Sequence, residues 1–179
     1  MTQKEESTMT TLDYANYLIN YALQHQHAIT YFQLQTNLFV LIAEEQRLTG
    51  QYPLTETFQA TVYGPRLATI ANMYRYFDPY PITHCQHQSR IRCHQGKFQL
   101  ETIPDQPLPE TFQTLVKQNL LTLLDITIFK IVDYIQSLPF SQQHAAKIYQ
   151  HQPLSYPPDA VTLDQPLATL IHHHFAISV

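Results

Sequence analysis

The sequence predicts a mainly α-helical domain with a small antiparallel β element. Three observations favour this compact α+β fold class: apolar residues recur every three or four positions over long stretches, short alternating stretches lie between them, and Pro or Gly stands at many boundaries. The chain has 179 residues, 44% of them hydrophobic, which suits one domain with a sizeable core. We therefore expect residues 1–179 to form a single domain.

Composition excludes several classes of protein. The formal net charge is −4 and Lys and Arg are not clustered, so we expect neither nucleic acid nor an anionic membrane as a partner. No apolar run approaches the roughly 20 residues that cross a bilayer, and the N-terminus lacks a secretory pattern. Two cysteines are too few for a disulfide framework, which favours a cytoplasmic protein.

Two amphipathic helices are predicted at the start of the chain. The first follows a Thr cap at Thr10 or Thr11 and has one apolar face from Leu12 to Leu23. The second runs over residues 31–49, with Thr30 as its cap and Gly50 just past its end. We expect them to pack as a helical hairpin.

Residues 58–82 are predicted to form a short extended stretch, a turn and a third helix. Phe58, Ala60 and Val62 alternate with polar residues. Gly64 permits a turn, and Pro65 suits the first position of a helix, which we expect to end at residues 78–81.

The rest of the chain divides into two parts. Residues 83–108 contain a predicted hairpin over 89–100, turning at 94–97, and a Pro-rich linker. Residues 109–179 carry C-terminal helices: a long pattern from Pro109 that is one helix or two broken near Thr127, then short helices over 141–150 and 166–174.

Residues 11–82 resemble the Panacea domain, a bacterial and phage domain. The resemblance rests on an Ala-containing first helix (LDYANYLI, residues 12–19), on ITYFQLQTNLFV (29–40) against the family's Ile-Thr-x-x-x-Leu-Gln-Lys-Leu-Leu-Tyr-Tyr, and on FQATVYGPR (58–66) followed by Tyr74. The order and spacing of the three pieces agree with the family. Three positions depart from it: Thr36 replaces Lys, Thr61 replaces Trp and Arg66 replaces Val.

The resemblance implies a small protein-binding domain that acts as an antitoxin. Family members neutralise a partner toxin by direct contact, in one case as an adaptor that delivers the toxin to a protease. The alternative is a regulatory or structural protein of a phage or mobile element that reuses the scaffold with another partner. Either reading implies binding without catalysis and without a cofactor.

The motif pieces provide two sets of candidate residues. The expected partner-contacting residues are Gln35, Thr36, Phe39, Tyr63, Arg66 and Tyr74, and the expected scaffold residues are Leu34, Leu38, Phe58, Ala60, Gly64 and Pro65. Arg66 beside the start of the third helix is a candidate for holding an acidic group of the partner. The alternative for this turn is a purely structural role of Gly64 and Pro65.

One further cluster has metal-ligand chemistry. Imidazole and thiolate groups are the ligands of structural zinc, and they occur just before and within the predicted hairpin, at His84, Cys85, His87, Cys93 and His94. The cluster has no Cys-x-x-Cys pair, and histidine is frequent throughout the chain, so incidental surface histidines are the alternative. Enzyme motifs are absent: the three glycines are scattered and form no phosphate loop, and there is no Gly-x-Ser-x-Gly or His-Glu-x-x-His.

Overall fold

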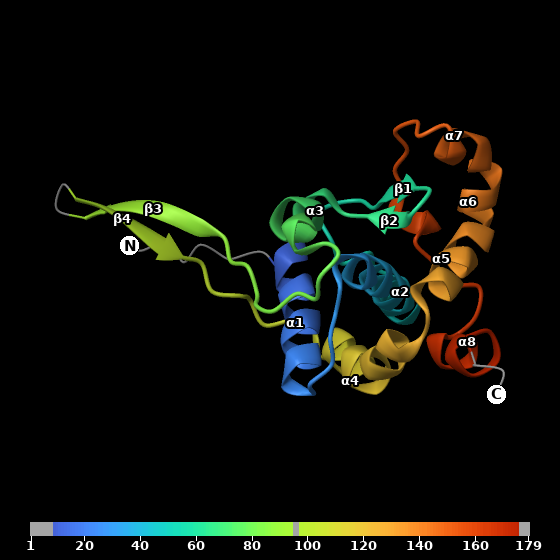
Figure 1. The fold of residues 1–179 in the computed structure, drawn as a ribbon, viewed down its shortest axis with the longest axis horizontal. Helices are drawn as coiled ribbons and strands as arrows, with labels where there is room; N and C mark the ends of the chain where they lie inside the picture. The colour runs from blue at the N-terminus through green and yellow to red at the C-terminus, as the bar shows by residue number, and fades with distance from the viewer. Residues whose placement is uncertain (1–8, 95–96, 176–179) are drawn as a thin grey trace.

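A computed structural model describes residues 9–94 and 97–175 and has a helical body from which one β-hairpin projects (Figure 1). The predicted fold class, mainly α with small antiparallel sheets, is confirmed. The elements in order are α1 Thr11–Gln24, α2 Tyr31–Thr49, β1 Gln59–Thr61, β2 Gly64–Arg66, α3 Ala68–Tyr74, η1 Arg75–Phe77, β3 Ser89–His94, β4 Lys97–Thr102, α4 Glu110–Asp125, α5 Ile128–Ser137, α6 Pro139–Gln143, α7 Ala145–Tyr149, η2 Pro158–Ala160 and α8 Leu167–His173.

The first two helices have the predicted boundaries and caps. Thr10 and Thr30 each accept a hydrogen bond from the backbone N–H three residues on, and Asp13 and Gln33 accept in return from the cap N–H groups. These are two capping boxes. Gly50 ends α2 in the left-handed conformation, with φ +71°, and donates its N–H to the Gln46 carbonyl. Local signals in the sequence therefore fix both helices.

Helix α2 lies at the centre of the body and is buried on every side over residues 34–45. It packs against α1, α4, α5 and β2 (Figure 1), and the hydrophobic core that surrounds it extends from Leu12 to Phe175. A helix covered all round must bury its polar side chains as well as its apolar stripe. Five polar residues of α2 are buried in this way: Gln35, Thr36, Asn37, Glu44 and Glu45.

Glu45 is a buried carboxyl group that forms no ion pair with another described residue. Its side chain is buried, and its Oε2 has no hydrogen-bond partner among the described residues. The hydroxyl of Tyr14, also buried, is unpartnered too, and the charge of Glu45 contributes to raising the pKa of Tyr14. Burial raises the pKa of Glu45 from 4.5 to about 7, because the charged form loses its hydration.

The third helix begins later than the sequence predicts. Pro65 was expected at its first position, but it lies in β2, opposite Ala60 of β1, and the helix begins at Ala68. The sheet has two strands, so Pro65 can sit in it without a backbone N–H to offer. The stretch that the sequence predicts as one extended segment and a turn thus forms a two-stranded hairpin, β1 with β2. Helix α3 ends at Tyr74, and the 3-10 turn η1 carries the helical segment on to Phe77, just before the predicted end at residues 78–81.

The C-terminal helices follow the alternative with a break near Thr127. Helix α4 ends at Asp125 and α5 begins at Ile128. The single short helix expected over 141–150 is wrong: α6 and α7 are separated at His144, whose ring Nδ1 lies 2.9 Å from the Phe140 carbonyl. The predicted last helix corresponds to α8. None of the described helices is both long and apolar enough to cross a membrane.

The projecting hairpin consists of β3 and β4, and we call residues 89–102 the arm (Figure 1). Its strands match the predicted hairpin, while residues 95–96 of the predicted turn lie outside the described residues. A polar network fixes its base to the body. Asn16 of α1 donates to the Gln86 carbonyl at 2.8 Å and to Asp105 at 2.7 Å, and Asp13 accepts from the Gln106 N–H at 2.9 Å.

Candidate functional site

The β1–β2 hairpin carries an exposed tyrosine at its tip. The strands pair Gln59 with Arg66 and Thr61 with Gly64, so the turn consists of Val62 and Tyr63. The Thr61 hydroxyl donates to the Gly64 carbonyl at 2.7 Å and accepts from the Tyr63 N–H at 3.2 Å. These bonds fix the turn, and they leave Tyr63 69% exposed.

Gly64 allows this hairpin to lie close against two helices. Its φ is +110°, a backbone conformation that residues with a side chain rarely adopt. A Cβ there would stand 3.2 Å from Val132 Cγ2 of α5 and 3.4 Å from Thr36 Cγ2 of α2. On the outer side, Gln136 of α5 donates to the Val62 carbonyl at 3.0 Å. The turn is therefore held by α2 and α5 together.

An apolar hollow of about 250 Å³ lies on one side of Tyr63. Phe129 of α5 is 73% exposed beside it, and the rings of Phe32 and Tyr63 are 6.5 Å apart between centroids. Apart from the tyrosine hydroxyl, its side chains are hydrocarbon. The lining residues are Phe32, Val62, Tyr63, Ile128, Phe129 and Val132.

A second hollow of about 410 Å³ shares Phe32 and Tyr63 with the first but has a polar wall. Arg66, Arg75 and His151 line it together with a single carboxylate, Asp78. Arg66 Nη1 donates to Gln59 Oε1 at 3.2 Å, which holds the guanidinium along the hairpin. We call this the cationic hollow, and we call Tyr63 with the two hollows the Tyr63 site.

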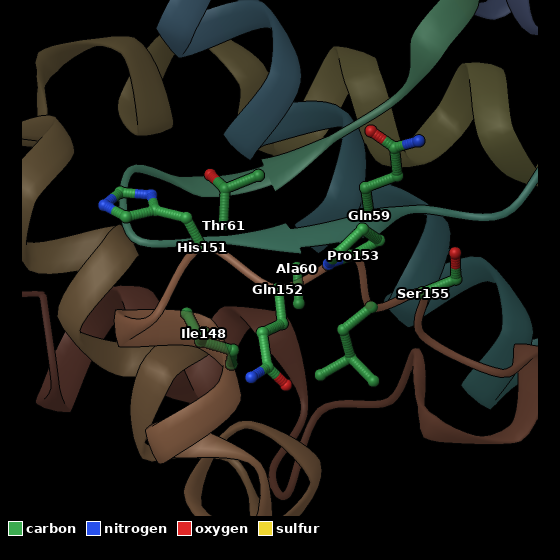
Figure 2. Close-up of a pocket in the computed structure, with 9 residues that line it drawn as sticks. Gln59, Ala60, Thr61, Ile148, His151, Gln152, Pro153 and Ser155 are labelled. Carbon is green, nitrogen blue, oxygen red and sulfur yellow. The ribbon is translucent and has the colours of Figure 1, made fainter.

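A third hollow of about 400 Å³ lies along the outer edge of β1 (Figure 2). Ile148, His151 and Gln152 face β1 across it, and the segment beyond Pro153 closes one end. That segment pairs with β1: the Ala60 N–H donates to the Leu154 carbonyl at 2.8 Å and the Tyr156 N–H to the Phe58 carbonyl at 2.7 Å. Apart from His151 its lining has no ionisable side chain, so it offers little chemistry.

Tyr63 and Arg66 are the two of the six predicted contact residues that reach the surface at the Tyr63 site; Gln35 also lines the cationic hollow but is buried. The other four are buried, so their expected exposure is wrong. Gln35, Thr36, Phe39 and Tyr74 are at most 2% exposed. The reason is the same for all four: each makes its contacts with elements distant in the sequence, which helical periodicity does not reveal.

The individual contacts explain these corrections. Gln35 hydrogen-bonds the backbone of Leu67, and the methyl group of Thr36 lies against Gly64 of β2, 3.4 Å from where a Cβ of residue 64 would stand. The ring of Phe39 packs against Phe58 and Tyr156, with centroids 5.0 and 5.1 Å away. The Tyr74 hydroxyl donates to Asn16 Oδ1 and accepts from the Gln86 N–H.

The predicted scaffold residues lie in the interior. The structure buries Leu34, Leu38, Phe58 and Ala60, and it places Gly64 and Pro65 in β2 against the core. The predicted position of Arg66 at the first turn of the third helix is corrected: Arg66 lies in β2, and α3 begins at Ala68, after Leu67.

The described members of the expected zinc cluster, His84, Cys85, His87 and Cys93, are not brought together. Among the described residues, no group of three or more His, Cys, Asp or Glu side chains is placed to hold a metal ion. His84 packs against Phe77, and His87 pairs with Asp105 at 3.2 Å. Cys85 lies against α1, where burial raises the pKa of its thiol to about 11. Cys93 and His94 belong to β3 of the arm.

Sequence reasoning missed Phe32, Phe129 and His151. Both phenylalanines lie on core helices but out of phase with the buried stripe: Phe32 precedes Leu34 and Leu38, and Phe129 falls between Ile128 and Ile131. A large aromatic residue out of phase on an amphipathic helix is the signal that would have found them. His151, with φ +55°, comes to the site through the fold alone.

Comparisons of the chain with models of protein families, with curated proteins and with solved structures found no match.

Proposed function

We propose that this chain is a protein-binding module that neutralises a partner toxin as antitoxins do, with the partner seated at the Tyr63 site. The observation that carries the proposal is the pair of unlike hollows on the two sides of one exposed tyrosine. Tyr, Phe and Arg are enriched at protein interfaces, where an aromatic side chain anchors and an arginine orients.

The two hollows define the chemistry of the partner segment. The apolar hollow, at about 250 Å³, has room for one large aliphatic or aromatic side chain. The cationic hollow presents Arg66 and Arg75, a pair that favours a carboxylate close to that apolar side chain. The proposed ligand is therefore a toxin segment with an apolar anchor and an acidic residue a few positions away.

The proposed action is binding in the cytoplasm, without a cofactor, a catalytic step or a nucleic-acid partner. The resemblance of residues 11–82 to the Panacea domain supports the antitoxin reading, and Tyr63 and Arg66 lie within that segment. Delivery of the bound toxin to a protease is a further part of the proposal.

A second candidate is a phage or mobile-element regulatory or structural protein that binds another partner at the same surface. The departures from the family pattern favour it, since Thr61 and Arg66 both lie in the β1–β2 hairpin that forms the site. A changed hairpin on a retained core is the pattern expected when a partner changes.

The test is co-expression with the product of the adjacent gene. The antitoxin proposal predicts that this product is toxic alone, is harmless together with the chain, and co-purifies with it. Tyr63→Ala and Arg66→Glu are expected to weaken binding at least about tenfold, because each removes an interface anchor. Tyr149→Ala is the matched control, since Tyr149 is 67% exposed and lines none of the three hollows.

The outcomes separate the candidates. A harmless neighbour that binds with Tyr63 dependence supports the second candidate and overturns the antitoxin role. Binding that survives both site variants would reject the Tyr63 site.

A further inference from the structure

The arm presents three large apolar side chains to solvent on one of its faces. Ile91, Phe98 and Leu100 are 72, 79 and 74% exposed, and Ile91 stands directly opposite Leu100. The opposite face carries Arg90, Arg92, Lys97 and Glu101. An isolated two-stranded hairpin is only marginally stable in water, and its free edges are templates for further pairing.

The outer edge of β4 pairs with no other described strand, and its backbone groups follow a defined pattern. The Ile103 N–H donates to the Gln88 carbonyl at 2.8 Å, so the hydrogen-bonded pairs of the ladder alternate from residue 103. Gln99 and Glu101 therefore turn their backbone groups toward β3. Phe98 and Leu100 turn theirs outward, to the free edge.

We propose that two copies of this chain pair through the free edges of β4, antiparallel about a two-fold axis at Gln99. In this register Phe98 of one copy stands opposite Leu100 of the other, and both belong to the outward-turned set that can exchange backbone hydrogen bonds. Lys97 stands opposite Glu101 of the second copy, twice by symmetry. The two hairpins become one four-stranded sheet.

Charge complementarity favours pairing through the edge of β4 over pairing through the edge of β3. Glu101 already accepts from Arg90 at 2.9 Å and Arg92 at 2.7 Å, yet its side chain is 44% exposed, and Lys97 has no ion pair with another described residue. Pairing through β3 would place arginine against arginine, because Arg90 and Arg92 flank the centre of that strand. Like charges directly opposite each other destabilise a ladder, so β3 is the protected edge.

The first test is the self-association of the full-length protein by sedimentation equilibrium. The wild-type chain is expected to be dimeric. Lys97→Glu places Glu against Glu101, and Glu101→Lys places Lys against Lys97, so each variant alone should dimerise at least about tenfold more weakly. An equimolar mixture of the two should recover association, because the mixed pair has opposite charges at both positions.

A matched control tests whether the change in net charge alone weakens dimerisation. Lys117→Glu makes the same charge change as Lys97→Glu on an exposed position of α4, away from the arm, and should dimerise like the wild-type chain. A monomeric wild-type chain overturns the proposal. So do single variants that dimerise normally, or a mixture that fails to recover association.

The second test is a cross-link at the symmetry axis. Gln99 faces its own copy in a non-hydrogen-bonded pair, whose Cα atoms lie about 4.5 Å apart, within disulfide range. In a Cys85→Ser/Cys93→Ser background, Gln99→Cys should give a disulfide-linked dimer under mild oxidation. Arg92→Cys, at the position paired with Gln99 on β3, is the control and should stay largely uncross-linked. Equal cross-linking of both variants would contradict the register.

The pairing does not depend on the proposed function. Tyr63→Ala and Arg66→Glu lie outside the arm and should leave self-association unchanged, while Lys97→Glu should leave the Tyr63 site intact. The two proposals can therefore fail separately.

Discussion

Gln35 bonds both ends of its side-chain amide to the backbone of Leu67. Its Oε1 accepts from the Leu67 N–H at 2.9 Å, and its Nε2 donates to the Leu67 carbonyl at 3.3 Å. Leu67 is the N-cap residue of α3, and its own side chain makes no capping hydrogen bond. The central helix therefore supplies the polar contact at the start of α3, and it does so 32 residues away in the sequence.

Removing this side chain is expected to destabilise the fold strongly. Gln35→Ala leaves the buried N–H of Leu67 without a partner, while the Leu67 carbonyl keeps its hydrogen bond from the Ala71 N–H at 3.0 Å. We expect a cost of about 1–3 kcal/mol in the free energy of unfolding. Urea denaturation followed by circular dichroism measures it. Gln118→Ala, at an exposed position of α4, is the control and should cost less than about 0.5 kcal/mol. Equal effects of the two substitutions would contradict the role of Gln35.

Glu45 predicts an unusual pH dependence of stability. Because the folded protein raises its pKa to about 7, the folded state binds this proton more tightly than the unfolded state does. Its contribution to stability is present below about pH 4.5 and is lost as the pH rises to about 7. Glu45→Gln removes this loss and should stabilise the protein at pH 8 by up to about 3 kcal/mol.

The measurement for Glu45 is urea unfolding of the wild-type chain and Glu45→Gln at pH 5 and pH 8. The difference between the two proteins should grow from pH 5 to pH 8. A difference that is constant with pH would show that Glu45 does not titrate in this range.

Alanine substitutions at Gly50 and Gly64, which both have a positive φ, should lower the free energy of unfolding by different amounts. Gly50→Ala meets no atom within 4 Å, so it should cost about 1 kcal/mol, from the left-handed backbone alone. Gly64→Ala adds a contact at 3.2 Å with Val132 and a φ of +110°, and should cost about 2–3 kcal/mol. Thermal and urea unfolding of both variants compare them. A Gly64→Ala protein as stable as Gly50→Ala would contradict the close approach of β2 to α5.

The hydroxyl of Tyr74 links the body to the base of the arm through hydrogen bonds. Tyr74→Phe removes the hydroxyl that donates to Asn16 and accepts from the Gln86 N–H at 2.7 Å. We expect a loss of about 1–3 kcal/mol in stability and faster hydrogen exchange of the Gln86 amide. Exchange measured by NMR checks the second effect. Tyr76→Phe, at an exposed tyrosine two residues away, should change neither.

The sequence by itself determined what depends on neighbouring residues. Thr10, Thr30 and Gly50 mark the ends of α1 and α2 because capping bonds and a left-handed glycine act within a few residues. The fold class and the arm strands follow from similar short-range patterns. The sequence prediction for residues 59–66 was wrong because proline suits both the start of a helix and an edge strand. The pairing of Pro65 with Ala60 decided between the two.

Only the tertiary structure decided which polar and aromatic side chains reach the surface. Gln35, Thr36 and Phe39 are buried because α1, α4, α5 and the β1–β2 hairpin cover α2 on every side. Tyr74 of α3 is buried against α1, where its hydroxyl bonds Asn16. Phe32 and Phe129 come together for the same reason. Helical periodicity states which residues share a face, and the packing of distant elements decides whether that face meets protein or water.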